Sequence, residues 1–163
     1  MRTIRTDPAL DLVLERTVDV APSFVWDAWT RPGLLKQWFC PKPWQTVDAE
    51  IELAPGGIFR TVMRGPDGTE FENIGCYLEV VPGRRLMWTG ALGPDYRPQA
   101  VGPAAPFVMT AIIDIEPTPS GGTKYTATVL HADASSREKH EAMGFRHGWS
   151  AALDQLVALA PAR

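Results

Sequence analysis

The sequence contains little cysteine and no long apolar run. Its two cysteines, Cys40 and Cys76, are too few for a disulfide framework and form no CxxC motif. No stretch reaches the roughly 20 apolar residues that a membrane-spanning helix needs, and no apolar run follows the arginines near the N-terminus, as a secretory signal would require. We therefore expect a cytoplasmic protein that does not insert into membranes.

Charge and motifs argue against several further classes of function. The 16 Lys and Arg residues are outnumbered by 19 Asp and Glu residues, whereas a nucleic-acid-binding surface needs a basic excess. The three histidines, His131, His140 and His147, fit neither HxxxH nor HExxH, so no metal is expected. The sequence has no nucleophile elbow, phosphate-binding loop or dinucleotide fingerprint. We therefore expect no cofactor, and no catalytic motif is evident.

The 163 residues alternate between apolar and polar side chains in several segments, which proline and glycine separate. We predict strands over residues 11–20, 46–53, 58–64, 69–81, 85–91, 107–116 and 123–131. Two short helices, over 22–30 and 32–39, follow the first strand, and each begins with a proline. An antiparallel sheet with helices on one face is an α+β fold. We predict one domain over residues 1–163, with its core between about 11 and 160.

The C-terminal segment has the apolar spacing of a helix. Ser135 and Glu138 fit a capping box, so we predict one long helix over about 136–160. Gly144 and Gly148 lie one turn apart beside its apolar stripe, and close packing against the sheet or room for a ligand would each account for them. The stripe consists of Phe145, Trp149, Leu153, Leu156 and Val157.

Alternation along the strands predicts an apolar inner face with few polar groups, which is typical of small-molecule sites. Strand 69–81 is ambiguous, because the set with Tyr77 and Glu79 and the set with Cys76 and Val80 are both mixed. Simple filling of the core is the alternative for each residue of the face. The predicted ligand-binding residues are Phe59, Tyr77, Trp88, Met109, His131, Phe145, Gly148 and Trp149.

Three other features carry open alternatives. His131 ends an apolar strand face, where it either contacts a ligand as hydrogen-bond partner or general base, or forms a half-exposed strand end. Arg16 lies among apolar residues and needs a partner, which is either a glutamate (Glu50, Glu52 or Glu79) or an anionic ligand. Residues 91–106, rich in Pro, Gly and Ala, form either a functional lid or a variable surface loop.

Four segments resemble one known family across nearly the whole chain. They are ERTVDVAPSFVWDAWTRPGLLKQWFCP (15–41), AEIELAPGGIFRTVMRGPDG (49–68), GCYLEVVPGRRLMWT (75–89) and GFRHGWSAALDQLVAL (144–159). The pair VW after AP, the PGG turn and the GW before spaced leucines are similar to the domain related to the activator of heat-shock-protein-90 ATPase, within the START-like (SRPBCC) superfamily.

The resemblance implies a helix-grip fold, in which a curved seven-stranded antiparallel sheet surrounds a long C-terminal helix. Superfamily members commonly hold an apolar small molecule between sheet and helix, while some are cyclases or hydrolases. The first hypothesis is therefore binding of an apolar, aromatic or polycyclic small molecule, with residues 91–106 gating the site. The second is a cyclase, dehydratase or hydrolase of a polyketide-like substrate, with His131, Tyr77 or Glu79 positioning a proton.

The family name adds a third hypothesis, a chaperone-associated interaction. The eukaryotic co-chaperone has an additional N-terminal domain that contributes to chaperone binding, whereas this chain starts directly at the first strand. Activation of heat-shock protein 90 is therefore not carried over. Family habit also suggests a homodimer, for which the sequence shows no clear interface.

Overall fold

The computed structural model describes residues 1–100 and 107–162. In this part of the chain, seven strands form an antiparallel sheet in the spatial order β1-β9-β8-β5-β4-β3-β2. These strands are β1 (Asp11–Val18), β2 (Gln45–Ile51), β3 (Ile58–Arg64), β4 (Glu70–Val81), β5 (Arg85–Thr89), β8 (Met109–Pro117) and β9 (Thr123–His131). The helices are α1 (Pro22–Thr30), α2 (Pro32–Leu35), α3 (Ala134–Ala142) and α4 (Phe145–Leu159).

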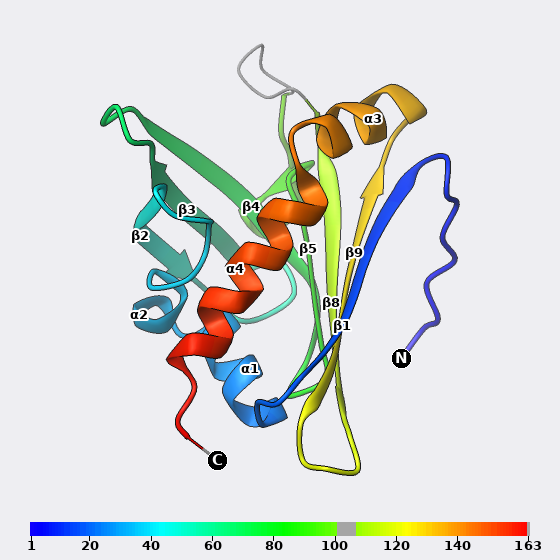
Figure 1. Cartoon of the computed structure of the whole chain (residues 1–163). Coiled ribbons are helices and arrows are strands. Elements are labelled where there is room, and N and C mark those ends of the chain that lie inside the picture. Colours follow the sequence, from blue (N-terminus) through cyan, green and yellow to red (C-terminus); the bar gives the residue numbers. More distant parts are fainter. Residues whose placement is uncertain (101–106, 163) are drawn as a thin grey trace.

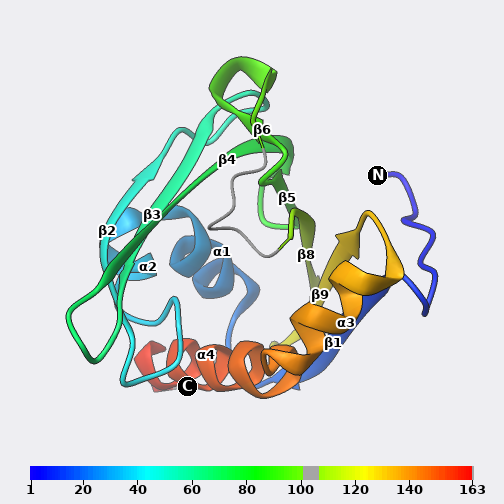
Figure 2. The ribbon, with the colours of Figure 1, turned by 90° about the horizontal axis from the view of Figure 1, so that it is seen from above.

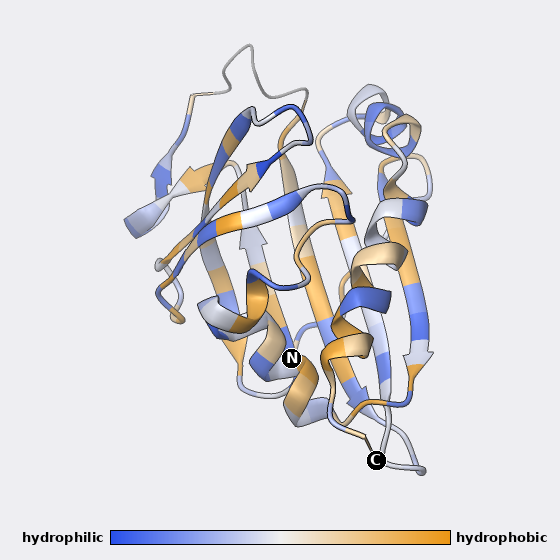
Figure 3. Ribbon diagram, turned by 60° about the vertical axis from the view of Figure 1, so that its left-hand side comes forward, coloured by the Kyte–Doolittle hydropathy of each residue, from blue (hydrophilic) through white to orange (hydrophobic). Residues whose placement is uncertain are grey.

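The sheet is strongly curved, and α4 runs diagonally across its concave side (Figure 1). Seen from above, the strands bend around α1, and α4 closes the side that they leave open (Figure 2). Hydrophobic residues recur along the strands and on α4 (Figure 3). The predicted α+β helix-grip architecture, with two short helices after the first strand, is confirmed.

One row of cross-strand neighbours defines the inner face of the sheet. From β1 to β4 the row runs through Leu12, Val129, Ala111, Trp88 and Tyr77, each paired with the next. All five side chains are buried. Because side chains alternate between the two faces of a strand, this row fixes the inner face of each strand that it crosses.

A bulge in β4 resolves the strand whose alternation is ambiguous in the sequence. The register against β5 shifts between Tyr77 and Glu79. Tyr77 faces the core before the bulge, and Val80, opposite Leu86, packs against the core after it. Glu79 lies on the outer face, with its Oε1 3.8 Å from Nη1 of Arg85. One extra residue therefore exchanges the two faces halfway along β4.

The outer face of the sheet holds the N-terminal segment through a buried arginine. Nε of Arg85 donates to Oδ1 of Asp114 at 2.7 Å, and its Nη1 donates to the carbonyl of Arg2 at 2.6 Å. The ion pair compensates part of the cost of burying the guanidinium. Residues at the start of the chain are thereby tied to the middle of the sheet.

Two helices, α3 and α4, replace the predicted single helix over 136–160. Gly144 between them has φ of +90°, a left-handed conformation that interrupts helical hydrogen bonding and strains any residue with a side chain. The N-cap of α3 is Asp133, whose carboxylate accepts from the N–H of Ser136 at 2.7 Å, and not the predicted Ser135. The prediction was wrong because a glycine inside a helical pattern does not reveal its backbone angles.

The second short helix is also shorter than predicted, because α2 ends at Leu35. Residues 36–44 continue as turns and bends toward β2. The backbone tightens at Cys40, whose N–H bonds the carbonyl of Trp38 only two residues back and whose φ is +148°. This irregular segment passes under α4 and forms one wall of the site described next.

Candidate ligand-binding site

Six aromatic rings lie against one another inside the curved sheet. Phe59 is central, because it stacks on Tyr77 with ring centroids 5.3 Å apart and meets Trp88 edge-on at 5.1 Å. The ring centroid of Phe39 lies 5.8 Å from that of Phe59. We call this group the inner aromatic cluster, and its members are Trp29, Trp38, Phe39, Phe59, Tyr77 and Trp88.

Few hydrogen bonds hold the inner aromatic cluster in place. Nε1 of Trp38 donates to the carbonyl of Ala28 at 3.0 Å, which fixes this indole against α1. Trp29 meets Trp38 edge-on at 4.8 Å and lies 5.2 Å from Trp88. Such pairs contribute about 0.5–1.5 kcal/mol each beyond the apolar area that they bury. The cluster is therefore a packed, mainly apolar part of the core.

A second group of aromatic rings surrounds His131 and His140 near the N-terminal end of α4. His131 Nε2 lies 3.0 Å from His140 Nδ1, and His131 Nδ1 lies 2.8 Å from the carbonyl of Leu10. Burial, and then the charge on His131, lowers the pKa of His140 to about 4. His140 is therefore neutral at physiological pH. This histidine–aromatic cluster consists of Phe107, His131, His140, Phe145 and Trp149.

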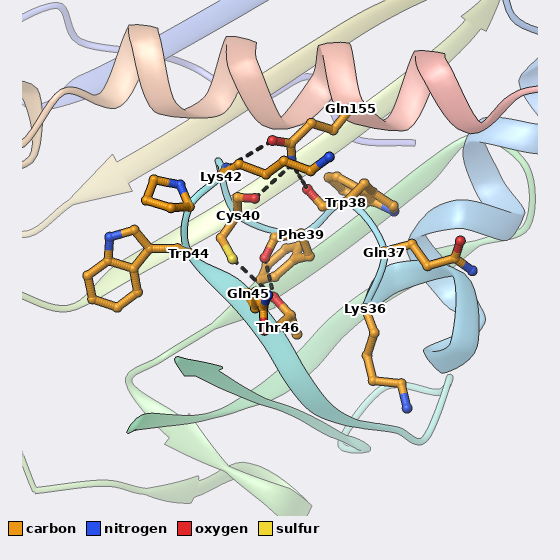
Figure 4. A pocket seen from close by; sticks show the side chains of 11 residues that line it. Lys36, Gln37, Trp38, Phe39, Cys40, Lys42, Trp44, Gln45, Thr46 and Gln155 are labelled. Atoms are coloured by element: carbon orange, nitrogen blue, oxygen red, sulfur yellow. Dashed lines mark hydrogen bonds between the residues drawn. The ribbon is translucent and has the colours of Figure 1, made fainter. Parts of the chain in front are cut away.

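A pocket of about 560 Å³ opens beside α4 and the inner aromatic cluster. Two of its lining residues, Trp38 and Phe39, belong to that cluster, whereas Lys36 and Lys42 lie at the solvent-exposed side. We call it the α2–β2 pocket (Figure 4). It is lined by Lys36, Gln37, Trp38, Phe39, Cys40, Lys42, Pro43, Trp44, Gln45, Thr46 and Gln155.

Gln155 on α4 organises the wall of the α2–β2 pocket. Its Nε2 donates to the carbonyls of Trp38 and Cys40 at 3.0 and 2.8 Å, and its Oε1 accepts from the N–H of Lys42 at 2.9 Å. Figure 4 shows this side chain reaching from α4 to the turns that follow α2. One glutamine thus takes over the hydrogen bonds that regular secondary structure would give this segment.

Cys40 lines the same pocket but is not an activated nucleophile. Its Sγ lies 3.4 Å from the hydroxyl of Thr46, which itself donates to the carbonyl of Phe39. Burial raises the pKa of the Cys40 thiol above its ordinary value. The thiol is therefore protonated at neutral pH, and only the thiolate attacks.

The eight predicted site residues fall into separate places. Phe59, Tyr77 and Trp88 belong to the inner aromatic cluster, and His131, Phe145 and Trp149 to the histidine–aromatic cluster. Met109 is the cross-strand partner of His131, and a Cβ at Gly148 would lie 3.9 Å from Pro41. Of the described residues that line the α2–β2 pocket, none is among the eight. The sequence reasoning missed Trp38, Phe39 and Gln155, although the two adjacent rings before Cys40 were a usable signal.

Arg16 pairs with a residue that the sequence analysis did not consider. Its Nη2 lies 2.7 Å from Oδ1 of Asp154, and its Nη1 donates to the backbone carbonyl and the hydroxyl of Ser150 at 3.0 Å. The predicted glutamate partners were wrong, because α4 is the element that crosses this face of β1. Glu79, a candidate for proton transfer, also faces away from the interior and pairs with Arg85.

The described part of the 91–106 segment is anchored to the sheet. It contains β6 (Leu92–Gly93), the 3₁₀ turn η1 (Pro94–Tyr96) and β7 (Arg97–Pro98). The N–H of Asp95 donates to the carbonyl of Gly56 at 2.7 Å, and the Gln99 side chain donates to the carbonyl of Ile74 at 2.8 Å. Residues 101–106, the remainder of the predicted gate, lie outside the described residues.

No group of three or more His, Cys, Asp or Glu side chains in residues 1–100 and 107–162 is placed to hold a metal ion. No helix in these same ranges is long and apolar enough to cross a membrane.

Known proteins place the chain in one family. Residues 19–160 match the family described as Activator of Hsp90 ATPase homolog 1-like protein. A crystal structure of a Nitrosomonas europaea protein is similar, with 47% identity, a TM-score of 0.88 and coverage of 94% of this chain and 96% of the other. A Rhodobacter sphaeroides protein shares the fold at 23% identity, with a TM-score of 0.80 and 96% of both chains covered.

A Mycobacterium smegmatis protein is 25% identical, with a TM-score of 0.74 and coverage of 95% of this chain and 93% of the other. No curated protein matches. The family match covers most of the chain, and the chain therefore belongs to the Activator of Hsp90 ATPase homolog 1-like family.

Proposed function

We propose that this protein binds an apolar, aromatic or polycyclic small molecule between the sheet and α4, and that the molecule enters through the α2–β2 pocket. The observation that carries the proposal is the position of Phe39. Its ring lines the pocket and also contacts Phe59 and Trp29 of the inner aromatic cluster. The Phe39 ring therefore lies between the pocket and the inner aromatic cluster.

The size of the pocket supports a small-molecule ligand. Binding sites for such molecules commonly measure about 300–1,000 Å³. The α2–β2 pocket, at about 560 Å³, has Trp38, Phe39 and Trp44 in its walls, together with the polar residues Lys36, Gln37, Lys42, Gln45, Thr46 and Gln155. Members of this family commonly bind hydrophobic ligands.

The hydrogen bonds around Phe39 indicate which side chain moves when a molecule enters. The neighbouring Trp38 is fixed by its indole N–H, and the backbone on both sides is fixed by Gln155. The Phe39 side chain has no group that can hydrogen-bond; its ring contacts other aromatic rings, and the residue is half-buried. A rotation of this ring would join the pocket to the inner aromatic cluster without disturbing the backbone.

Equilibrium dialysis with naphthalene tests the proposal. The wild-type chain should bind it saturably, and Phe39→Leu should bind about 3–10-fold more weakly, because the leucine keeps the apolar bulk and loses the ring contacts. Phe71→Leu is the matched control, since Phe71 is an exposed ring that contacts Trp44 but does not itself line the pocket. No binding by the wild type, or an equal loss in both variants, would contradict the proposal.

The second candidate is a cyclase, dehydratase or hydrolase that acts on a polyketide-like substrate. The favouring observation is the buried imidazole of His131, which is positioned by Leu10 and by a neutral His140. Incubation with a poly-β-carbonyl thioester should then yield a product that His131→Gln does not form. An identical product yield from the wild type and the variant would remove this candidate.

A further inference from the structure

The hydroxyl of Tyr77 is a buried polar group without a partner. The residue is 0% exposed, and among the described residues its hydroxyl oxygen has no hydrogen-bond partner. Most buried hydroxyls in proteins are paired, since an unpaired one loses its hydration without compensation. Such a group in a native fold calls for a specific explanation.

The described residues around Tyr77 offer its hydroxyl no acceptor. Its ring stacks on Phe59, and its cross-strand neighbour on β5 is Trp88. Burial raises the pKa of Tyr77 far above the ordinary value, so the phenol is neutral and available as a donor. The O–H is therefore an unused donor within the apolar cluster that the proposed function assigns to the ligand.

Two other buried polar side chains of the interior are satisfied. Thr123 donates its hydroxyl to the carbonyl of Val20 at 2.7 Å, and the indole of Trp38 donates to Ala28. Among the described residues of the inner aromatic cluster, the Tyr77 hydroxyl and Nε1 of Trp29 are buried without a hydrogen-bond partner. Tyr125 is a second buried tyrosine on the inner face of the sheet.

We infer that the Tyr77 hydroxyl is the hydrogen-bond donor that recognises the ligand, and that it selects planar apolar molecules carrying an acceptor oxygen, such as aromatic ketones and quinones. The inference rests on the proposed function and deepens it. A ligand with an acceptor oxygen forms a hydrogen bond with the Tyr77 hydroxyl, whereas the corresponding hydrocarbon makes only apolar contacts. Tyr77 is thereby a specificity-determining residue.

Two probes that differ by one oxygen test the inference. Fluorene and 9-fluorenone share three fused rings, and only the ketone has an acceptor. Equilibrium dialysis against the wild-type chain and Tyr77→Phe should show a 5–10-fold loss of affinity for 9-fluorenone, with the affinity for fluorene unchanged within twofold. Tyr125→Phe, the matched control, should change neither affinity. Equal changes for both probes in Tyr77→Phe, or no change for either, would overturn the inference.

Stability measurements separate ligand recognition from a structural role. If the hydroxyl has no partner in the free protein, urea unfolding should find Tyr77→Phe at least as stable as the wild type, and Thr123→Val, which removes a paired hydroxyl, less stable. A loss of stability in Tyr77→Phe as large as in Thr123→Val would mean that the hydroxyl is already satisfied, for example by a buried water, and would refute the inference. Failure of the wild type to bind either probe would instead overturn the proposed function itself.

Discussion

His131 on β9 and His140 on α3 share a hydrogen bond of 3.0 Å between Nε2 of the first and Nδ1 of the second. Because the carbonyl of Leu10 can only accept, Nδ1 of His131 carries a proton. In the neutral pair, Nε2 of His131 then accepts from Nδ1 of His140. If both histidines were protonated, the second positive charge would be buried among Phe107 and Phe145, and Asp133 would be the nearby acidic group.

This relationship predicts that stability falls on acidification. The pKa of His140 is about 4 in the folded chain and 6.5 as a reference value, so the unfolded chain binds more protons between these limits. The free energy of unfolding should therefore decrease as the pH falls from 6.5 towards 4. The loss has an upper limit of about 3.5 kcal/mol, at about 1.4 kcal/mol per pKa unit.

Urea unfolding at pH 7 and at pH 4.5 measures this loss. His140→Gln should flatten the pH dependence, whereas His147→Gln should leave it as in the wild type, because His147 is exposed. The same slope in His140→Gln as in the wild type would exclude His140 as its source. The comparison of variants removes the contributions of carboxylates that titrate in the same range.

Gln155→Leu should destabilise the chain by about 2 kcal/mol. The change leaves the carbonyls of Trp38 and Cys40 and the N–H of Lys42 without their side-chain partner. Gln37→Leu is the matched control, because this pocket glutamine makes one exposed bond to the carbonyl of Gly33. Chemical denaturation would compare them, and equal stabilities would mean that Gln155 does not hold the pocket wall.

Two glycines should respond oppositely to alanine. A Cβ at Gly57 would lie 2.0 Å from the carbonyl oxygen of Glu52 and 2.9 Å from that of Ala54, which are backbone atoms that cannot turn away. Gly57→Ala should therefore cost about 3 kcal/mol or more. Gly33→Ala meets nothing within 4 Å on helix α2 and should gain about 0.5–1 kcal/mol. Thermal unfolding that ranks the two variants in the reverse order would contradict the packing described.

The sequence was sufficient wherever structure depends on local periodicity. Alternation located the seven strands and the inner faces of β5, β8 and β9, because side-chain direction follows from position along a strand. It failed on β4, where the bulge beside Tyr77 depends on the register with β5. It also failed at Gly144, where the backbone angle and not the residue type decides whether one helix continues.

The candidate site was predictable only in part, because its contacts join distant segments. The aromatic residues of the inner face follow from alternation, but the α2–β2 pocket lies in turns that have no period. Gln155 contacts residues more than 110 positions away. The partner of Arg16 likewise depends on which helix crosses β1, and no pattern near Arg16 specifies that.

The most direct test of ligand binding between sheet and α4 is the indole N–H region of the ¹H–¹⁵N spectrum during titration with 9-fluorenone. The six tryptophans of the chain report separately. The signals of Trp38 and Trp88, in the inner aromatic cluster, should shift saturably, whereas that of Trp26, outside the cluster, should stay in place. An unchanged spectrum, or a shift confined to the exposed Trp44, would contradict a binding site in the interior.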